Sequence, residues 1–504
     1  MKSLFDQGAP APVPASFNMA AHVLAAGEKT PEKIALSVIG AGTCEDWTFG
    51  QLRRAILGTG RGLLDHGLVR GDLVLMRLGN TVDFPIAYLG AIAAGLVPIP
   101  TSAALTHDET ARIIDELAPA AVLCAAGVPC PDVENIIDTH KLADMRTLPE
   151  IQFDMGDPDR LGYIIYTSGT SGMPRAVAHA HRAIWARQMM FDGWYAMTAQ
   201  DRILHAGAFN WTYTLGTGLM DPWTLGATAL IAQAGTPASD LAGLLKTHKA
   251  SIFAAAPGVY RQMLKQNTPL DLPCLRHGLS AGEKLSTRIE DMWHAATGTK
   301  IYEAYGMSEC STFISASPSN PVPQGRLGRP QKGRRIAILG PNGPVDIGCE
   351  GTIAVHKDDP GLMLGYLHAK SETASKMQGD WFLTGDQGQM EPDGQITYLG
   401  RADDMMNAGG YRVSPIEVEQ ALTGFPGLRA VGAAEVEIKA DARVIAAFYT
   451  SDAPLDEAAL DRYAQTKLAR YKQPRLYVHL PQLPLGANGK LLRRALKATY
   501  EGKS

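Results

Sequence analysis

Residues 166–175 form the segment with the clearest capacity for chemistry, reading Tyr-Thr-Ser-Gly-Thr-Ser-Gly-Met-Pro-Arg. Its glycines allow backbone N–H groups to approach an anion closely, and its hydroxyls supply further hydrogen-bond donors. The segment follows an apolar run, Leu-Gly-Tyr-Ile-Ile, and ends on the basic residue Arg175, neither of which a Ser/Thr-rich linker needs. The pattern therefore predicts a loop that holds the β- and γ-phosphates of ATP. It lacks the GxxxxGK[ST] spacing, which disfavours a P-loop NTPase.

Three further segments each end on one charged side chain in a glycine-containing context. Glu309 closes Tyr-Gly-Met-Ser-Glu, Asp386 closes Trp-Phe-Leu-Thr-Gly-Asp, and Lys490 closes Leu-Gly-Ala-Asn-Gly-Lys. A glutamate supplies the hard oxygen ligand that Mg²⁺ prefers beside phosphates, and an aspartate can accept two hydrogen bonds from paired hydroxyls. Taken singly, each has an ordinary explanation: an exposed loop glutamate, a turn and a solvated lysine. A shared function becomes the better interpretation only when their order along the chain is considered.

A fifth segment, residues 400–419, reads Gly-Arg-Ala-Asp-Asp-Met-Met-Asn-Ala-Gly-Gly-Tyr-Arg-Val-Ser-Pro-Ile-Glu-Val-Glu. Together and in order, the five segments resemble the motifs of adenylate-forming (AMP-binding) enzymes, in the acyl-CoA synthetase branch and closest to medium-chain and benzoate-type acid:CoA ligases. The resemblance spans roughly residues 30–500. The loop departs from it at one place, because the family usually has Pro-Lys-Gly where this chain has Pro174-Arg175-Ala176.

The resemblance implies a role for each residue of these motifs. The implied catalytic residues are Lys490, Glu309 and Thr167, and Glu309 is also the implied ligand of Mg²⁺. The residues implied to bind ATP or coenzyme A are Ser168, Gly169, Thr170, Ser171, Gly172, Arg175, Glu303, Tyr305, Gly306, Ser308, Asp386, Arg401, Gly409, Gly410 and Arg412. Asp403 is the implied hinge. ATP, Mg²⁺ and coenzyme A are thus the expected cofactors, and a small carboxylic acid is the expected substrate.

The implied reaction has two halves. The carboxylate of the acid attacks the α-phosphate of ATP, so two anions must meet and charge neutralisation is expected to dominate the catalysis. Lys490 would bridge the two anions while the loop and Mg²⁺ hold the departing pyrophosphate. The small domain would then turn about Asp403 and bring the thiol of coenzyme A to the acyl-adenylate, since such hinges absorb large changes in a few residues.

The acid-binding residues are expected in two segments, 209–223 and 280–283, which resemble the acyl pocket of medium-chain and benzoate-type enzymes. The pocket candidates are Trp211, Tyr213, Ala281 and Gly282. An apolar lining suits a small or medium aliphatic or aromatic monocarboxylate. No basic residue in these segments would pair with a second carboxylate, which disfavours a dicarboxylate. Core packing explains any single aromatic residue here equally well.

The composition is that of an ordinary globular protein. The 504 residues carry a formal net charge of −4 with 45% hydrophobic residues, which does not favour a nucleic-acid binder. The six cysteines form no close CxxC pair, so we expect reduced thiols and no zinc site. The first residues lack the apolar core of a secretory signal, and no apolar run is long enough to span a bilayer. We therefore expect a cytoplasmic protein without nucleic-acid or membrane partners, and a homodimer stays open.

Helix-period and strand-period runs alternate through the first 330 residues and predict an α/β fold with parallel sheets. Thr48–Leu68 and Phe84–Leu96 are expected helices, AAVLCA and YIIYTS are expected buried parallel strands, and residues 1–30 are an expected surface arm. Short strands separated by Gly, Pro and Asn then predict a β subdomain, followed by a small mobile α+β unit. The predicted domains are 1–402, which binds ATP and the acid, and 403–504, which carries the catalytic lysine.

Other functions stay open at this point. A stand-alone adenylation enzyme would load a carrier protein, although no carrier domain follows Ser504, which favours coenzyme A. Luciferase chemistry is rarer. A catalytically inactive family member with a binding role is favoured only by Arg175-Ala176. An oxidoreductase is the weakest alternative because no GxGxxG follows a strand.

Overall fold

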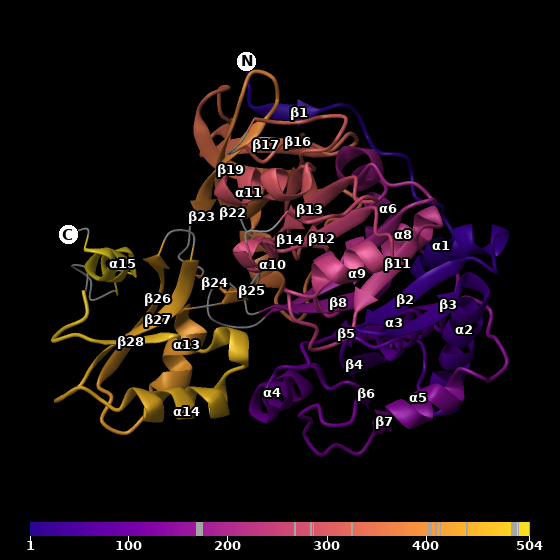
Figure 1. The fold of residues 1–504 in the computed structure, drawn as a ribbon, viewed down its shortest axis with the longest axis horizontal. Helices are drawn as coiled ribbons and strands as arrows, with labels where there is room; N and C mark the ends of the chain where they lie inside the picture. Colours follow the sequence, from indigo (N-terminus) through magenta and orange to yellow (C-terminus); the bar gives the residue numbers. More distant parts are fainter. Residues whose placement is uncertain are drawn as a thin grey trace.

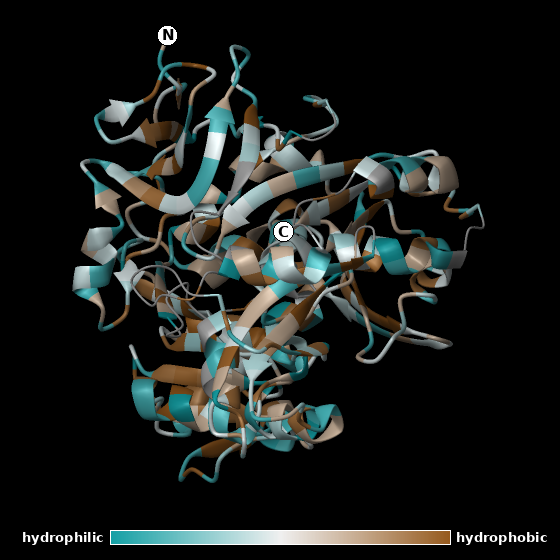
Figure 2. Ribbon diagram, turned by 90° about the vertical axis from the view of Figure 1, so that its left-hand side faces the viewer, coloured by the Kyte–Doolittle hydropathy of each residue, from teal (hydrophilic) through white to brown (hydrophobic). Residues whose placement is uncertain are grey.

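The computed structural model describes residues 1–167, 175–266, 269–282, 285, 287–323, 326–401, 406–408, 411–413, 415–439, 442–484, 491 and 493–502. A large unit holds the chain up to β23, and a smaller C-terminal unit lies beside it (Figure 1). Hydrophobic and hydrophilic residues alternate along many of the strands and helices (Figure 2), as expected for elements with one buried face. No helix among the described residues is long and apolar enough to cross a bilayer.

The largest element is a nine-stranded sheet whose inner strands are parallel. Its strands, in spatial order, are β16 (Arg329–Pro330), β15 (Ser311–Ser315), β14 (Ile301–Met307), β13 (His277–Ala281), β12 (Ile252–Ala255), β10 (Arg202–His205), β11 (Thr228–Ala232), β2 (Ile34–Gly40) and β3 (Thr43–Thr48). Antiparallel pairs lie only at the two ends of this sheet. Its central strands β12 and β13 are buried throughout, as parallel strands covered on both faces are. The predicted α/β architecture is confirmed.

Short helices connect the strands of this sheet. They are α7 (Thr212–Leu215), α8 (Asp221–Leu225), α9 (Leu241–Thr247), α10 (Pro257–Met263) and α11 (Thr287–Thr297). Another short helix, α6 (Ala183–Ala186), follows β9 (Arg175–Ala180) and precedes β10. A π-helical turn, η3 (Gly216–Met220), joins α7 to α8.

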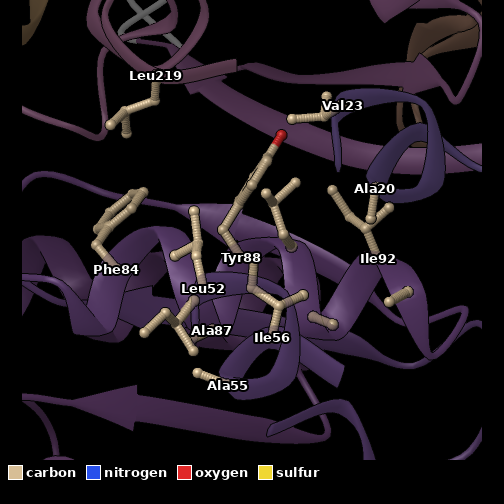
Figure 3. Close-up of a cluster of buried hydrophobic side chains, with 14 of the residues drawn as sticks. Ala20, Val23, Leu52, Ala55, Ile56, Phe84, Ala87, Tyr88, Ile92 and Leu219 are labelled. Carbon is tan, nitrogen blue, oxygen red and sulfur yellow. The ribbon is translucent and has the colours of Figure 1, made fainter. Parts of the chain in front are cut away.

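A second, four-stranded parallel sheet consists of β5 (Val97–Pro100), β4 (Leu73–Arg77), β6 (Ala121–Cys124) and β7 (Ile136–Asp138). Its helices are α2 (Phe49–Asp65), α3 (Asp83–Ala93), α4 (His107–Leu117) and α5 (Thr139–Met145). Of these, α2 and α3 are the two predicted helices. Thr48 and Gln51 form a capping box that fixes the start of α2. Figure 3 shows Tyr88 of α3 among apolar side chains of α2, including Leu52 and Ile56.

The strand before the phosphate loop is antiparallel, which corrects the prediction for YIIYTS. β8 (Leu161–Thr167) and β9 (Arg175–Ala180) form a hairpin, and β20 (Gly365–Tyr366) pairs with the outer side of β9. The apolar pattern indicates burial, and burial alone does not distinguish parallel from antiparallel pairing. The prediction for AAVLCA is confirmed, because β6 is parallel to both of its neighbours.

Residues 1–30 are not a surface arm throughout, contrary to the prediction. β1 (Leu4–Asp6) extends the edge of the β subdomain, and α1 (Met19–Leu24) buries four of its six residues. Asn18 starts α1, because its side chain accepts hydrogen bonds from two backbone N–H groups of the first turn. The Pro- and Ala-rich composition of the preceding residues concealed this short amphipathic helix.

The predicted β subdomain is a seven-stranded antiparallel sheet. Its strands are β1, β17 (Arg335–Gly340), β18 (Gly343–Pro344), β19 (Glu350–His356), β21 (Met377–Gln378), β22 (Trp381–Met390) and β23 (Ile396–Arg401). The short helix α12 (Lys370–Ser375) lies between β20 and β21.

The C-terminal unit has its own sheet and its own apolar clusters. The elements are the hairpin β24 (Met406–Ala408) and β25 (Tyr411–Val413), the helices α13 (Pro415–Leu422), α14 (Glu457–Lys467) and α15 (Arg493–Glu501), and the sheet β26 (Ala430–Lys439), β27 (Ala442–Thr450) and β28 (Leu476–His479). One cluster contains Val418 and Ile445, and the other contains Phe448 and Leu496. The predicted boundary between residues 402 and 403 falls within 402–405, outside the described residues.

Candidate active site

The predicted phosphate loop connects β8 to β9, so its base is the loop end of the β8–β9 hairpin. Thr167 and Arg175 are paired across the two strands, and the guanidinium of Arg175 forms an ion pair with Glu372 of α12. Ala176, where the family usually has glycine, is a buried residue of β9, so a methyl side chain fits this hairpin. The predicted loop residues Ser168, Gly169, Thr170, Ser171 and Gly172 lie outside the described residues.

Glu309 lies between β14 and β15, next to this hairpin. Its backbone carbonyl accepts a hydrogen bond from the N–H of Met363 at 2.7 Å, and its Oε1 accepts one from the hydroxyl of Tyr366 at 2.8 Å. Burial first, and then the nearby carboxylate, raise the pKa of Tyr366, so this hydroxyl stays a donor. Because Tyr366 belongs to β20, the sheet that carries Arg175 also orients Glu309.

The donor set suits Mg²⁺ only when phosphates complete the coordination. Among the residues that the structure describes, no group of three or more His, Cys, Asp or Glu side chains could hold a metal ion. Mg²⁺ keeps several waters and typically uses one or two protein carboxylates together with substrate phosphates. Glu309 offers one such carboxylate, so a Mg²⁺–nucleotide complex fits and a stand-alone metal centre does not.

Asp386 is buried and is approached by two tyrosines from different strands. The hydroxyl of Tyr305 donates to its Oδ2 at 2.6 Å, and the hydroxyl of Tyr398 donates to its Oδ1 at 3.3 Å. Asp386 is also paired in register with Arg401 across β22 and β23. Tyr305 and Asp386, both implied by the resemblance to bind ATP or coenzyme A, therefore meet where the two sheets adjoin. The side chain of Arg401 lies outside the described residues.

The remaining predicted nucleotide residues on β14 serve the local backbone. A side chain at Gly306 would place its Cβ 2.1 Å from the carbonyl oxygen of Ser311, so the approach of β15 requires glycine. Ser308 accepts a hydrogen bond from Nε2 of His179 through its carbonyl, at 2.7 Å. Glu303 is buried, and its Oε1 accepts from the N–H of Leu285 at 2.9 Å, which fastens the segment after β13.

The four predicted pocket residues differ in how deeply they are buried. Tyr213 is 6% exposed, and its hydroxyl donates to the carbonyl of Leu279 at 3.0 Å, so this ring packs in the core. Ala281 belongs to the same buried cluster, and Gly282 has a φ of 93°, which favours glycine. Trp211 is only partly buried, and its ring meets that of Tyr213 edge to face with centroids 5.1 Å apart. Of the four, Trp211 is therefore the one at the boundary between core and cleft.

The C-terminal unit touches the large unit at Trp211. The ring of Tyr411, on β25, stacks against Trp211 with centroids 6.2 Å apart and against Tyr471 with centroids 4.0 Å apart. Gly409 and Gly410, between β24 and β25, lie outside the described residues, as do Asp403, Lys490 and the side chain of Arg412. The hairpin that carries the predicted coenzyme A residues thus lies beside the predicted pocket.

A buried ion triad joins the two units next to this stack. Nζ of Lys472 lies 2.7 Å from Oε1 of Glu417 in the C-terminal unit and 3.2 Å from Oε1 of Glu109 on α4. All three side chains are at most 10% exposed. Burial alone would lower the pKa of Lys472, but Tyr471 and the two carboxylates more than offset this and raise it above its usual value. The lysine therefore remains charged and links the units.

Four residues of this site have no signal in the sequence. Tyr366 and Tyr398 are isolated tyrosines in strand-like runs, and Glu372 lies in the first turn of the short helix α12. Lys472 lies in a basic stretch typical of a solvated surface. Each acquires its role only through a partner distant in sequence.

Hydroxyl, guanidinium and carboxylate groups from separate strands and loops thus contact one another in this region, which suits the binding of a nucleotide. The family model described as AMP-binding enzyme matches residues 23–367, which is more than half of the chain, and the chain belongs to this family.

The relatives lie in the predicted acyl-CoA synthetase branch. The chain is 27% identical to the mitochondrial acyl-coenzyme A synthetase ACSM3 of Rattus norvegicus over 96% of this chain and 91% of that protein. It is 26% identical to the 3-hydroxybenzoate–CoA ligase of Aromatoleum sp. (strain CIB), over 90% and 92% of the two chains. Its fold is similar to that of a double mutant of o-succinylbenzoate CoA synthetase from Bacillus subtilis bound to a product analogue, with a TM-score of 0.84, 23% identity, and coverage of 96% and 98%.

Proposed function

We propose that the chain is an AMP-forming acid:CoA ligase, which activates a small or medium monocarboxylate as an acyl-adenylate and transfers the acyl group to coenzyme A. The family membership and the named relatives support this reaction class. The observation that carries it is that four residues of the predicted site, Arg175, Glu309, Asp386 and Trp211, each contact a partner from another segment. These partners are Glu372, Tyr366, Tyr305 and Tyr411.

In the first half-reaction the carboxylate of the acid must approach ATP, and both are anions. Described residues would contribute charges that act on the phosphates. Arg175 lies at the base of the phosphate loop, and Glu309 is held by Tyr366 in the position for a phosphate-bound cation. Bound Mg²⁺ would neutralise charge on the leaving pyrophosphate. Lys490 would neutralise the attacking carboxylate and the α-phosphate. This mechanism needs no protein nucleophile, because positioning and electrostatics lower the barrier.

The orientation of the C-terminal unit corresponds to the second half-reaction in this account. The β24–β25 hairpin stands at Trp211, where the thiol of coenzyme A must reach the acyl group. The Glu109–Lys472–Glu417 triad holds the hairpin there. For adenylate formation, residues 403–504 would turn about Asp403 and bring Lys490 to the cleft.

The test separates the reaction classes. Acid-dependent ATP–pyrophosphate exchange should occur without coenzyme A, and stoichiometric AMP and thioester should form once coenzyme A is added. Exchange with no thioester, together with acylation of a carrier protein, would instead establish a carrier-loading enzyme. Failure of every acid in a panel of short-chain, medium-chain and aromatic acids to support exchange would overturn the proposal.

Tyr366→Phe is expected to raise the Mg²⁺ concentration required for half-maximal exchange by about 10-fold, because a ligand that loses its outer partner binds metal less tightly. The measurement is a Mg²⁺ titration of ATP–pyrophosphate exchange at saturating ATP and acid. Tyr449→Phe removes a hydroxyl that accepts from the N–H of Leu455 in the C-terminal unit, and it serves as the control. An unchanged Mg²⁺ requirement in Tyr366→Phe would show that the 2.8 Å contact does not position Glu309.

A further inference from the structure

A small cavity lies between the β8–β9 hairpin, α3 and the start of α7. Its volume of about 20 Å³ accommodates about one water molecule or one hydroxyl group. Apolar side chains form about half of its wall, and the ring of Tyr163, also in the wall, stacks on that of His179 with centroids 4.8 Å apart. The other residues of the wall that carry polar side chains are Tyr88, His179, Arg187, Thr212, Ser308 and Ser311. Thr212 follows the pocket residue Trp211, and Ser308 precedes Glu309. The cavity is thus lined by the segments that carry two residues of the proposed site, Trp211 and Glu309.

His179 lines this cavity and carries a hydrogen-bond acceptor that is free within the described part of the structure. Its Nε2 lies 2.7 Å from the carbonyl oxygen of Ser308, and a carbonyl only accepts, so Nε2 carries the hydrogen. Burial lowers the pKa of His179 to about 4, so the ring is neutral near pH 7 and Nδ1 holds a lone pair. Nδ1 is buried and has no hydrogen-bond partner among the described residues. It needs a group that donates.

Tyr88 presents a hydroxyl to the same cavity. The residue is fully buried, and its hydroxyl also lacks a partner within the described part of the chain. Figure 3 shows this oxygen pointing away from Ala55 and Ala87, toward the side of Val23 and Leu219. A buried polar group without a hydrogen bond is unfavourable, so two such groups around one cavity indicate an occupant that bonds to both.

The charge in the cavity wall is already balanced. The guanidinium of Arg187 lies 2.6 and 2.8 Å from the two carboxylate oxygens of Asp221, and both side chains are buried. A carboxylate in the cavity would be a third, uncompensated charge and could not donate to Nδ1. A carbonyl could not donate either. A hydroxyl donates to Nδ1 of His179 and accepts from Tyr88, and it fits the volume.

Building on the proposed function, we propose that this cavity binds a hydroxyl group of the acid, and that the substrate is a hydroxy-carboxylic acid whose hydroxyl lies distal to the reacting carboxylate. Tyr88 and His179 then determine specificity for the hydroxyl, while the carbon skeleton of the acid stays outside the cavity, in the proposed acid site. A water molecule fills the same place when the acid lacks the hydroxyl, so discrimination against the deoxy acid is moderate.

The test compares matched acids in ATP–pyrophosphate exchange without coenzyme A: a hydroxy acid, its deoxy analogue, and the keto and dicarboxylic acids of the same skeleton, for aliphatic and aromatic series. We expect kcat/KM for the best hydroxy acid to exceed that of its deoxy analogue by about 10- to 100-fold. Equal values across every matched series would overturn the inference and leave the proposed function intact. If no acid supports exchange, the proposed function itself fails.

Two variants assign the discrimination to the cavity. Tyr88→Phe keeps the buried ring, and His179→Gln keeps an amide donor for the Ser308 carbonyl, so each removes mainly its contact with the ligand hydroxyl. Each should reduce the hydroxy-to-deoxy ratio of kcat/KM by about 10-fold. Tyr477→Phe removes another buried hydroxyl without a partner among the described residues, in the C-terminal unit, and should leave the ratio unchanged. A ratio that stays unchanged in both Tyr88→Phe and His179→Gln would overturn the assignment.

Discussion

Lys490→Ala is expected to reduce acid-dependent ATP–pyrophosphate exchange by about 10³-fold or more while leaving thioester formation from supplied acyl-adenylate within about threefold of wild type. The acid carboxylate and the α-phosphate repel each other until a cation stands between them. Loss of a single neutral donor to such a transition state commonly costs about 10²- to 10³-fold, and a full positive charge contributes at least as much. The second half-reaction starts from a neutral acyl carbon and has no need of this charge.

The measurement uses two assays on one preparation: isotope exchange between pyrophosphate and ATP, and rapid-quench thioester formation from synthetic acyl-adenylate. Lys497→Ala, on α15, removes a positive charge close by in the chain and controls for a general charge effect. Equal losses in both assays for Lys490→Ala would contradict the proposed division of labour.

Lys472→Met is expected to have the opposite selectivity, slowing thioester formation from supplied acyl-adenylate by about 10²-fold while changing exchange by less than about threefold. Without the ammonium group, the carboxylates of Glu109 and Glu417 are left buried without their shared cation. Removal of one partner from a buried ion pair costs about 3–5 kcal/mol, and each 1.4 kcal/mol is a factor of ten. The two carboxylates regain water when the units separate, so the orientation with Tyr411 at Trp211 loses population.

Two further variants sharpen this experiment. Lys467 and Asp108 join the same two units by an exposed ion pair at 3.6 Å, and such pairs contribute little, so Lys467→Ala should change neither assay by more than about twofold. Glu109→Gln retains a capping residue for α4 while removing one charge, and should slow thioester formation less than Lys472→Met. If Lys472→Met slowed both half-reactions equally, the triad would be a general stabilising contact without a role in domain orientation.

Patterns that are local in sequence predicted the fold well. The period of the apolar residues identifies α2, and the apolar, Gly-interrupted run identifies the fully buried α3, because these signals depend only on which residues face the core. The same signal could not assign β8 as antiparallel, since a buried strand looks alike in both kinds of sheet. It also missed α1, whose six residues are too few for a period to emerge from a Pro- and Ala-rich region.

The sequence likewise predicts some residues of the candidate site and misses others. Thr167, Glu309 and Asp386 stand within short motifs, so the sequence indicates them directly, whereas their partners come from elsewhere in the chain. Tyr366 and Glu309 are 57 residues apart, and Lys472 and Glu109 are 363 residues apart. No local pattern encodes such pairs, because they arise when sheets adjoin or when the two units dock. Tyr213 is the opposite case: its segment predicts a pocket residue, but the side chain packs in the core.

The most direct test follows the oxygen atoms of the acid. With an accepted acid labelled with ¹⁸O in its carboxylate, complete turnover with ATP and coenzyme A should transfer one labelled oxygen to the phosphate of AMP, as mass spectrometry would show. That transfer requires a bond between the carboxylate and the α-phosphate, which is the central claim. Label appearing in inorganic phosphate, or AMP carrying no label while thioester accumulates, would contradict activation through an acyl-adenylate.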